Sequence, residues 1–153
     1  MILDEIAART RQRVEEEKAQ ISLDEMRARA LAMEATTDFP FEAALRAPGI
    51  SFICEVKKAS PSKGIIAQEF PYLSIARDYQ TAGAAALSVL TEPYYFKGSD
   101  AYLREIAQVV DTPLLRKDFV VDPYMIYQAK TLGASAVLLI CEVGASGLRK
   151  TTS

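Results

Sequence analysis

The chain has 153 residues, of which 50% are hydrophobic and 25% charged, so it is long enough for one ordinary domain with a buried core. Its net charge of -2 gives no reason to expect a nucleic-acid or membrane partner, and no apolar run reaches the roughly 18 residues that span a bilayer. Histidine is absent, which excludes histidine-based catalytic triads and disfavours the usual zinc sites.

The first residues, MILDEIAARTRQRVEEEK, are acidic and periodic. They lack the basic start and apolar core of a signal peptide, so we expect a cytoplasmic protein. Cys54 and Cys141 each lie in an apolar run, and we expect both to be buried, reduced thiols.

Three helices are predicted in the first third of the chain. Apolar side chains recur at helical spacing over residues 2–20, which predicts an amphipathic helix. Ser22 is followed by Glu25, and this capping-box spacing predicts that a second helix begins there. A short third helix begins at Pro40 and ends before Pro48.

The pattern then changes to short apolar strands that alternate with helices. Strands are predicted at residues 51–57, 85–90, 112–117 and 135–141, and helices at 72–84, 99–110 and 122–133. Ser99 and Asp122 are suited to N-cap the second and third of these helices, and Gly133 is suited to end the third. This alternation predicts parallel strands joined by right-handed crossovers.

Two architectures fit the alternation: an open doubly wound sheet and a (β/α) barrel. The first strand is followed by SPSKG, which is neither a GxGxxG motif nor a P-loop, and this favours the barrel. An eight-stranded barrel needs about 200 residues or more. The chain is therefore a fragment, or pairs with another half, or forms an open sheet.

Charged side chains lie on one face of the first predicted strand. Glu55 and Lys57 share that face with Ile53, because side chains alternate along a strand. The other face is apolar and suited to pack against outer helices; it carries Phe52, Cys54 and Val56. The charged face would then point into a barrel and toward its C-terminal mouth, where barrel active sites lie.

The third predicted strand repeats this arrangement with Leu115, Lys117 and Phe119 on one face. Two lysines and one glutamate thus converge on one mouth, where they can bind an anion or donate a proton. The alternative is a structural salt bridge in the barrel core, with Lys58 and Arg116 solvated at the rim.

Two loops follow the strands. Ser60 lies in a turn after the first strand, where ordinary turn chemistry is the alternative to substrate contact. Phe96 and Gly98 lie in a loop after the second strand, and the aromatic ring there either covers a planar substrate or packs onto the barrel.

Three segments together carry a specific resemblance: ICEVKKASPSKG, LTEPYYFKGS and LLRKDF. In this order they closely resemble the N-terminal half of the indole-3-glycerol-phosphate synthase family of tryptophan biosynthesis, up to about Cys141. The resemblance implies a (β/α)8 TIM barrel of which this chain has about the first four β/α units. Residues 1–48 would form an N-terminal helical extension and residues 49–153 the partial barrel.

The family is a carboxy-lyase that acts on 1-(2-carboxyphenylamino)-1-deoxyribulose 5-phosphate. It closes the indole ring with loss of carbon dioxide and water, and needs no metal or organic cofactor. The resemblance therefore implies a phosphorylated small-molecule substrate, with no nucleic-acid or membrane partner.

The family's site residues map onto this chain one by one. By resemblance, Lys117 is the general acid at the substrate carbonyl oxygen, Lys57 binds the substrate carboxylate or phosphate, and Glu55 orients the lysines. The resemblance also assigns substrate contacts, to Ser60, Phe96, Phe119 and Leu138.

The family pattern continues through later strands that carry the general base, and these strands are not in this sequence. We expect a truncated or frame-shifted product, with an unpatterned tail from about Glu142, that has little or no activity alone. Self-association of such a half-barrel is an open possibility. The rival interpretations are another phosphate-handling barrel enzyme, a non-enzymatic half-barrel binding or assembly module, and a flavodoxin-like open sheet.

Overall fold

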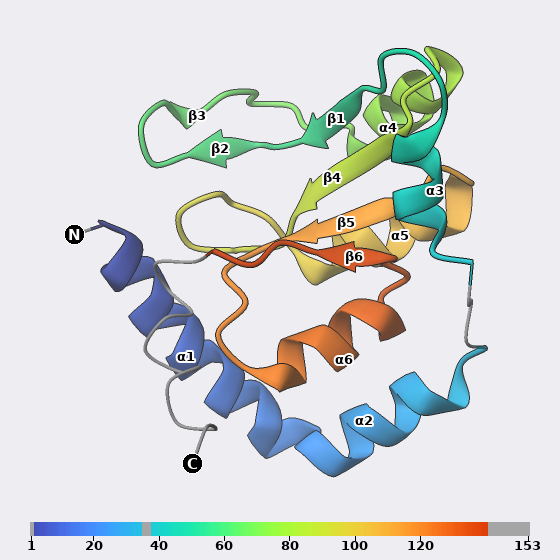
Figure 1. Cartoon of the computed structure of the whole chain (residues 1–153). Coiled ribbons are helices and arrows are strands. Elements are labelled where there is room, and N and C mark those ends of the chain that lie inside the picture. The colour runs from blue at the N-terminus through green and yellow to red at the C-terminus, as the bar shows by residue number, and fades with distance from the viewer. Residues whose placement is uncertain (1, 35–37, 141–153) are drawn as a thin grey trace.

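A computed structural model describes residues 2–34 and 38–140 (Figure 1). Four parallel strands form the main sheet: β1 (Ile53–Val56), β4 (Ala86–Leu90), β5 (Leu114–Lys117) and β6 (Ala136–Val137). The crossover helices are α4 (Tyr72–Thr81), α5 (Asp100–Val109) and α6 (Pro123–Thr131). The N-terminal helices are α1 (Ile2–Gln20), α2 (Leu23–Ala32) and α3 (Pro40–Arg46).

The strand order decides between the two predicted architectures. The order is β1-β4-β5-β6, so each new strand is added on the same side of the one before. A doubly wound sheet reverses direction at a switch point, and these four strands contain no reversal. A sheet that always grows in one direction is the arc of a barrel, as the sequence predicted.

The outer face of this arc is the main hydrophobic core. Leu87 and Val89 of β4 are fully buried there against Ala76 of α4 and against Leu103 and Ile106 of α5. Burying each large side chain stabilises the fold by about 1.5–3 kcal/mol. The opposite, inner face is left for the charged side chains, as their alternation predicts.

Helices α1 and α2 form a second packed layer with α6, whereas α3 lies against β4. Helix α2 lies against α6, and α1 passes beside the carboxyl ends of the strands (Figure 1). Val14 of α1 and Met26 of α2 pack against Tyr124 and Met125 at the start of α6. The predicted start of α2 is confirmed, because Ser22 Oγ accepts a hydrogen bond of 3.1 Å from the amide of Glu25.

The helix caps predicted after the strands are also confirmed. Ser99 and Asp122 accept hydrogen bonds from the amides of Ala101 and Tyr124, the second residues of α5 and α6. The turn predicted after β1 is present, and two short antiparallel strands that were not predicted flank it: β2 (Ala59–Ser60) and β3 (Gly64–Ile65).

The environment of the first strand also differs from the prediction. Phe52 was expected to pack under outer helices, but it is 65% exposed. Cys54 was expected to be buried and is only half-buried, as a free thiol. The reason is that β1 is an edge strand of the main sheet, where β4 is the one strand of residues 2–34 and 38–140 that pairs with it. Cys141 lies outside the described residues.

Among the helices of the described part of the chain, none combines the length and apolar character needed to cross a membrane.

Candidate active site

Glu55 stands between two lysines at the carboxyl ends of the strands. Lys117 Nζ lies 2.8 Å from Glu55 Oε2, and Lys57 Nζ lies 3.2 Å from Glu55 Oε1. The three side chains are 28–35% exposed, so the cluster is half-buried and open to solvent. The predicted convergence of two cations and one carboxylate at one mouth is confirmed.

Strand register explains how these side chains meet. Glu55 of β1 pairs with Ser88 of β4, and Ser88 pairs with Leu115 of β5. These residues share the inner face, and Lys117 follows Leu115 on that face at the last position of β5. Because the intervening Ser88 side chain is small, Lys117 can reach Glu55 across β4.

The two lysines control the charge of Glu55. Partial burial by itself would raise the pKa of Glu55, but the hydrogen bonds and charges of Lys117 and Lys57 outweigh burial and leave the pKa below its ordinary value. The carboxylate therefore stays ionised near neutral pH, and it orients two ammonium groups at the mouth.

Two aromatic rings lie near each other beyond the strand ends. The ring centroids of Phe96 and Phe119 are 6.3 Å apart, with 37° between the ring planes. Phe119 is 7% exposed and comes two residues after Lys117, beyond the end of β5. The pair offers an apolar surface of the kind that a planar ligand ring packs against.

The other two predicted substrate contacts, Ser60 and Leu138, lie outside the cluster of Glu55, Lys57 and Lys117. Ser60 is buried in the hairpin, where its Oγ accepts a hydrogen bond of 3.3 Å from the amide of Lys63. That is the turn chemistry given as its alternative, so substrate contact by Ser60 stays a prediction. Leu138 follows β6 and is 38% exposed.

The loop that carries Phe96 is organised by a glutamate that the sequence analysis missed. Glu92 is 1% exposed, and its carboxylate accepts hydrogen bonds of 2.7–2.9 Å from the amides of Tyr94, Tyr95 and Phe96. At Gly98 the loop returns to β4, where an added Cβ would lie 2.3 Å from the carbonyl oxygen of Leu90. Glu92 therefore fixes the backbone that presents the Phe96 ring.

A second missed feature is the buried charge cluster beside Lys117. Asp118, with a fully buried side chain, accepts hydrogen bonds from Arg13 of α1 at 2.8 Å and from Thr91 at 2.6 Å. Lys117 and Phe119 flank Asp118 in the chain, so the ion pair ties helix α1 to the segment that carries both. Arg9 of the same helix also stacks over the Tyr94 ring, 4.3 Å from the centroid.

Arg116 corrects one alternative from the sequence analysis. The structural salt-bridge interpretation placed Arg116 on the solvated rim of the barrel. In the structure the side chain of Arg116 is only 1% exposed. Its Nη2 lies 2.9 Å from Asp100 Oδ1 of α5, and its Nη1 donates to the carbonyl oxygen of Met125 in α6. The outward position of Arg116 in β5 thus joins two helices, while Lys117 points inward. For Lys58 no ion pair is found within the described part of the chain.

Residues 3–149 match the family model for indole-3-glycerol phosphate synthase. The chain belongs to the indole-3-glycerol phosphate synthase family. It is 52% identical over 141 residues to the indole-3-glycerol phosphate synthase of Ruminiclostridium cellulolyticum, and 53% identical over 143 residues to that of Endomicrobium trichonymphae. The two alignments cover 92% and 94% of this chain, but 54% and 55% of the relatives.

The chain therefore spans about half the length of the curated relatives it matches. The parallel sheet of this indole-3-glycerol phosphate synthase family member is part of a TIM barrel, as predicted. The family match reaches residue 149, further than the resemblance seen up to about Cys141. The expected tail from Glu142 lies outside the described residues, and the domain boundary at residue 48 stays a prediction.

Proposed function

We propose that this chain carries the general-acid side of an indole-3-glycerol phosphate synthase active site in the cytoplasm. The enzyme converts 1-(2-carboxyphenylamino)-1-deoxyribulose 5-phosphate to indole-3-glycerol phosphate, carbon dioxide and water. The observation that supports this most strongly is the Glu55 carboxylate between Lys57 and Lys117 at the carboxyl ends of parallel strands. Barrel enzymes hold their chemistry at that end.

Lys117 is proposed as the general acid. The ring carbon that bears the carboxylate attacks the carbonyl carbon of the sugar chain, and Lys117 Nζ gives its proton to the carbonyl oxygen, which becomes a hydroxyl. The bond between ring and carboxylate then breaks, its electron pair restores the aromatic ring, and carbon dioxide leaves. The hydroxyl departs as water with a proton from the adjacent carbon, which completes the indole.

The neighbours of Lys117 fit the rest of the substrate. Lys57 offers an ammonium group to the substrate carboxylate or phosphate, and Glu55 orients both lysines and offsets positive charge on the intermediate. Phe96 and Phe119 offer an apolar wall for the anthranilate ring, with Leu138 proposed as a further lining residue.

The final loss of a proton needs a general base, which the family resemblance assigns to a later strand. We therefore expect the 153-residue chain alone to bind substrate weakly and to turn it over slowly or not at all. A non-enzymatic binding module predicts the same inactivity for the chain alone, so the decisive test must supply the rest of a barrel.

We further infer that the isolated chain associates with itself. No other strand of the described residues pairs with the outer edge of β1 in the main sheet. Apolar side chains beside this edge are exposed: Ile50 is 86%, Phe52 65% and Ile53 49% exposed. Exposed edges and apolar patches of this kind favour association between chains. Sedimentation should show a dimer or larger species that Phe52→Lys weakens; a well-behaved monomer would contradict this inference.

The test of the proposed activity is a chimera. Residues 1–140 of this chain are joined to the part of the Ruminiclostridium cellulolyticum relative that follows the position aligned with residue 140. Formation of indole-3-glycerol phosphate is followed by fluorescence for the chimera and for the chain alone. We expect turnover only from the chimera. A folded chimera without turnover would contradict the proposal and favour the binding module.

A further inference from the structure

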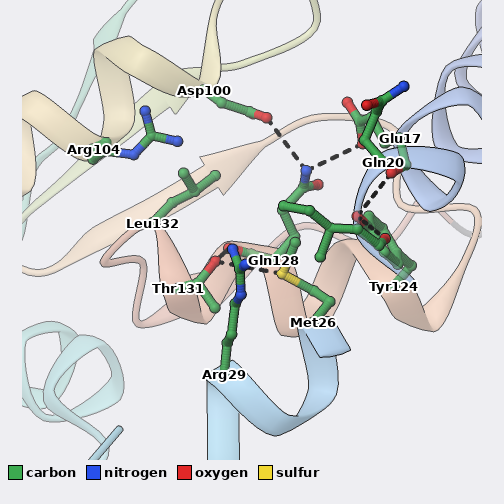
Figure 2. A pocket seen from close by; sticks show the side chains of 11 residues that line it. Glu17, Gln20, Met26, Arg29, Asp100, Arg104, Tyr124, Gln128, Thr131 and Leu132 are labelled. Atoms are coloured by element: carbon green, nitrogen blue, oxygen red, sulfur yellow. Dashed lines mark hydrogen bonds between the residues drawn. The ribbon is translucent and has the colours of Figure 1, made fainter. Parts of the chain in front are cut away.

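A separate hollow lies among the helices (Figure 2). Its volume is about 370 Å³, and its walls come from α1, α2, α5 and α6. Neither Lys117 nor Glu55 lines it. All four helices lie within the described residues, so this hollow is formed by the chain itself and does not depend on the proposed function.

One wall of the hollow is acidic. The Gln128 amide nitrogen donates hydrogen bonds to Glu17 Oε2 at 3.1 Å and to Asp100 Oδ2 at 3.4 Å. Burial and the nearby charge of Asp100 raise the pKa of Glu17, despite the opposing effects of Gln128 and nearby arginines. Asp100 is already paired with Arg116 at 2.9 Å, whereas the Glu17 carboxylate hydrogen-bonds only the neutral amide of Gln128 among the described residues. A cation placed beside Glu17 would therefore offset its charge.

The same glutamine carries an unused acceptor. Gln128 is 7% exposed, and its Oε1 atom has no hydrogen-bond partner among the described residues. Buried amide oxygens normally have a partner, because leaving one without a hydrogen bond is costly. A ligand that donates a hydrogen bond would satisfy this atom.

The remaining walls are basic and apolar. Arg104 of α5 is exposed, and it makes no hydrogen bond or ion pair with any residue that the structure describes. Arg29 of α2 also lines the hollow (Figure 2). Its guanidinium group is paired with the Glu25 carboxylate. Leu132 and Met26 are 4% and 5% exposed and give the hollow apolar sides.

We propose that this hollow binds a small apolar α-amino acid, with its ammonium group at Gln128 Oε1 and Glu17 and its carboxylate toward Arg104 and Arg29. Charge complementarity selects this class of ligand. A simple anion such as phosphate would meet the Glu17 and Asp100 carboxylates, and a diamine would meet the two arginines. A zwitterion with an apolar side chain matches both charged walls and the side chains of Met26 and Leu132.

The test is calorimetric titration of the full chain with L-leucine, L-methionine and L-phenylalanine. Two probes each keep one charged end of L-leucine: 3-methylbutylamine has no carboxylate, and 4-methylpentanoate has no ammonium group. We expect at least one amino acid to bind with a Kd of about 1 mM, and both half-probes to bind at least about tenfold more weakly than L-leucine.

Two matched arginine variants test whether the amino acid binds in the hollow. Arg104→Ala should weaken amino-acid binding by about tenfold, because Arg104 supplies a free cation to the carboxylate. Its exposed position means that the fold is retained, which circular dichroism checks. Arg77→Ala removes another exposed arginine, on α4 and outside the hollow, and should change nothing.

A third variant tests the acidic wall. Glu17→Gln keeps the side-chain shape and should weaken binding of L-leucine and of 3-methylbutylamine, but not of 4-methylpentanoate. The proposal is overturned if none of the three amino acids binds, if the half-probes bind as tightly as L-leucine, or if Arg104→Ala and Arg77→Ala bind alike.

Discussion

Lys117 Nζ lies 2.8 Å from Glu55 Oε2, although the strands that carry them, β5 and β1, are not neighbours in the sheet. Strand β4 lies between them, and its Ser88 faces the same side as Glu55. The contact therefore depends on the register of three strands at once. It also places an ammonium group over the inner face of the sheet, where we propose that it gives a proton to the substrate carbonyl oxygen.

Glu55→Gln should remove a stabilising charge in a pH-dependent way. Because the pKa of Glu55 is lowered in the folded state, its contribution is present above the unfolded value of about 4.3 and is lost as pH falls through the folded value. The cluster is partly exposed, so at neutral pH we expect a loss of at most about 1 kcal/mol in the free energy of unfolding.

The measurement is urea unfolding of the parent chain and Glu55→Gln between about pH 7 and pH 3. The two curves should approach each other toward the acid end. Glu69→Gln changes an exposed glutamate outside the cluster and serves as the control. A difference between the parent and Glu55→Gln that stays constant across this range would contradict the account of Glu55.

Arg13→Met should be strongly destabilising, since it leaves the fully buried Asp118 carboxylate without its ion-pair partner from α1. Breaking a buried pair from one side costs about 3–5 kcal/mol, and the Thr91 hydrogen bond places the expected loss near the lower end. Urea unfolding measures it. Arg11→Met, an exposed position on the same helix, should cost far less; equal losses would show that Asp118 does not need Arg13.

Glu92→Ala should free the loop that presents Phe96. The substitution removes the acceptor for three amides. A hydrogen bond to a charged group contributes about 1.5–3 kcal/mol to stability. Hydrogen exchange at Tyr94, Tyr95 and Phe96 should accelerate by about 100-fold. Glu92→Gln keeps one acceptor oxygen and should give an intermediate rate. Unchanged exchange in Glu92→Ala would mean that other contacts hold the loop.

The inner face of the sheet was predictable from the sequence because strand geometry is regular. Alternation placed Glu55 and Lys57 on one face of the first strand and Lys117 on the same face of the third. Parallel strands end at the same edge, so the convergence of these three side chains followed from the strand assignments. The strand–helix alternation itself gave the α/β class, and only the order of strands was needed to select the barrel.

The outward charges were not predictable in the same way. Arg13 and Asp118 are 105 positions apart, and no local pattern pairs them. Arg116 did carry a signal that was overlooked: alternation places it on the apolar, outward face, where an arginine must be buried with partners. Glu92 was missed because its hydrogen bonds go to backbone amides of a loop whose course the sequence does not reveal.

The exposure of Phe52 was also beyond the sequence analysis, for a different physical reason. Alternation placed this side chain on the outward face, but whether a helix covers that face depends on which strand is at the edge of the sheet. In the structure β1 is an edge strand, and Phe52 remains 65% exposed. Strand periodicity predicts the direction of a side chain and not the presence of a neighbour.

The most direct test of the account is turnover by the chimera with Lys117→Met, compared with Lys58→Met. Both variants remove an ammonium group near the mouth. Lys58, however, makes no ion pair among the described residues, and strand alternation predicts that its side chain lies on the face opposite to that of Lys57. The account predicts that Lys117→Met lowers kcat by about 1,000-fold or more, while Lys58→Met stays within about tenfold of the parent. Equal activity of the two variants would contradict the assignment of Lys117 as the general acid.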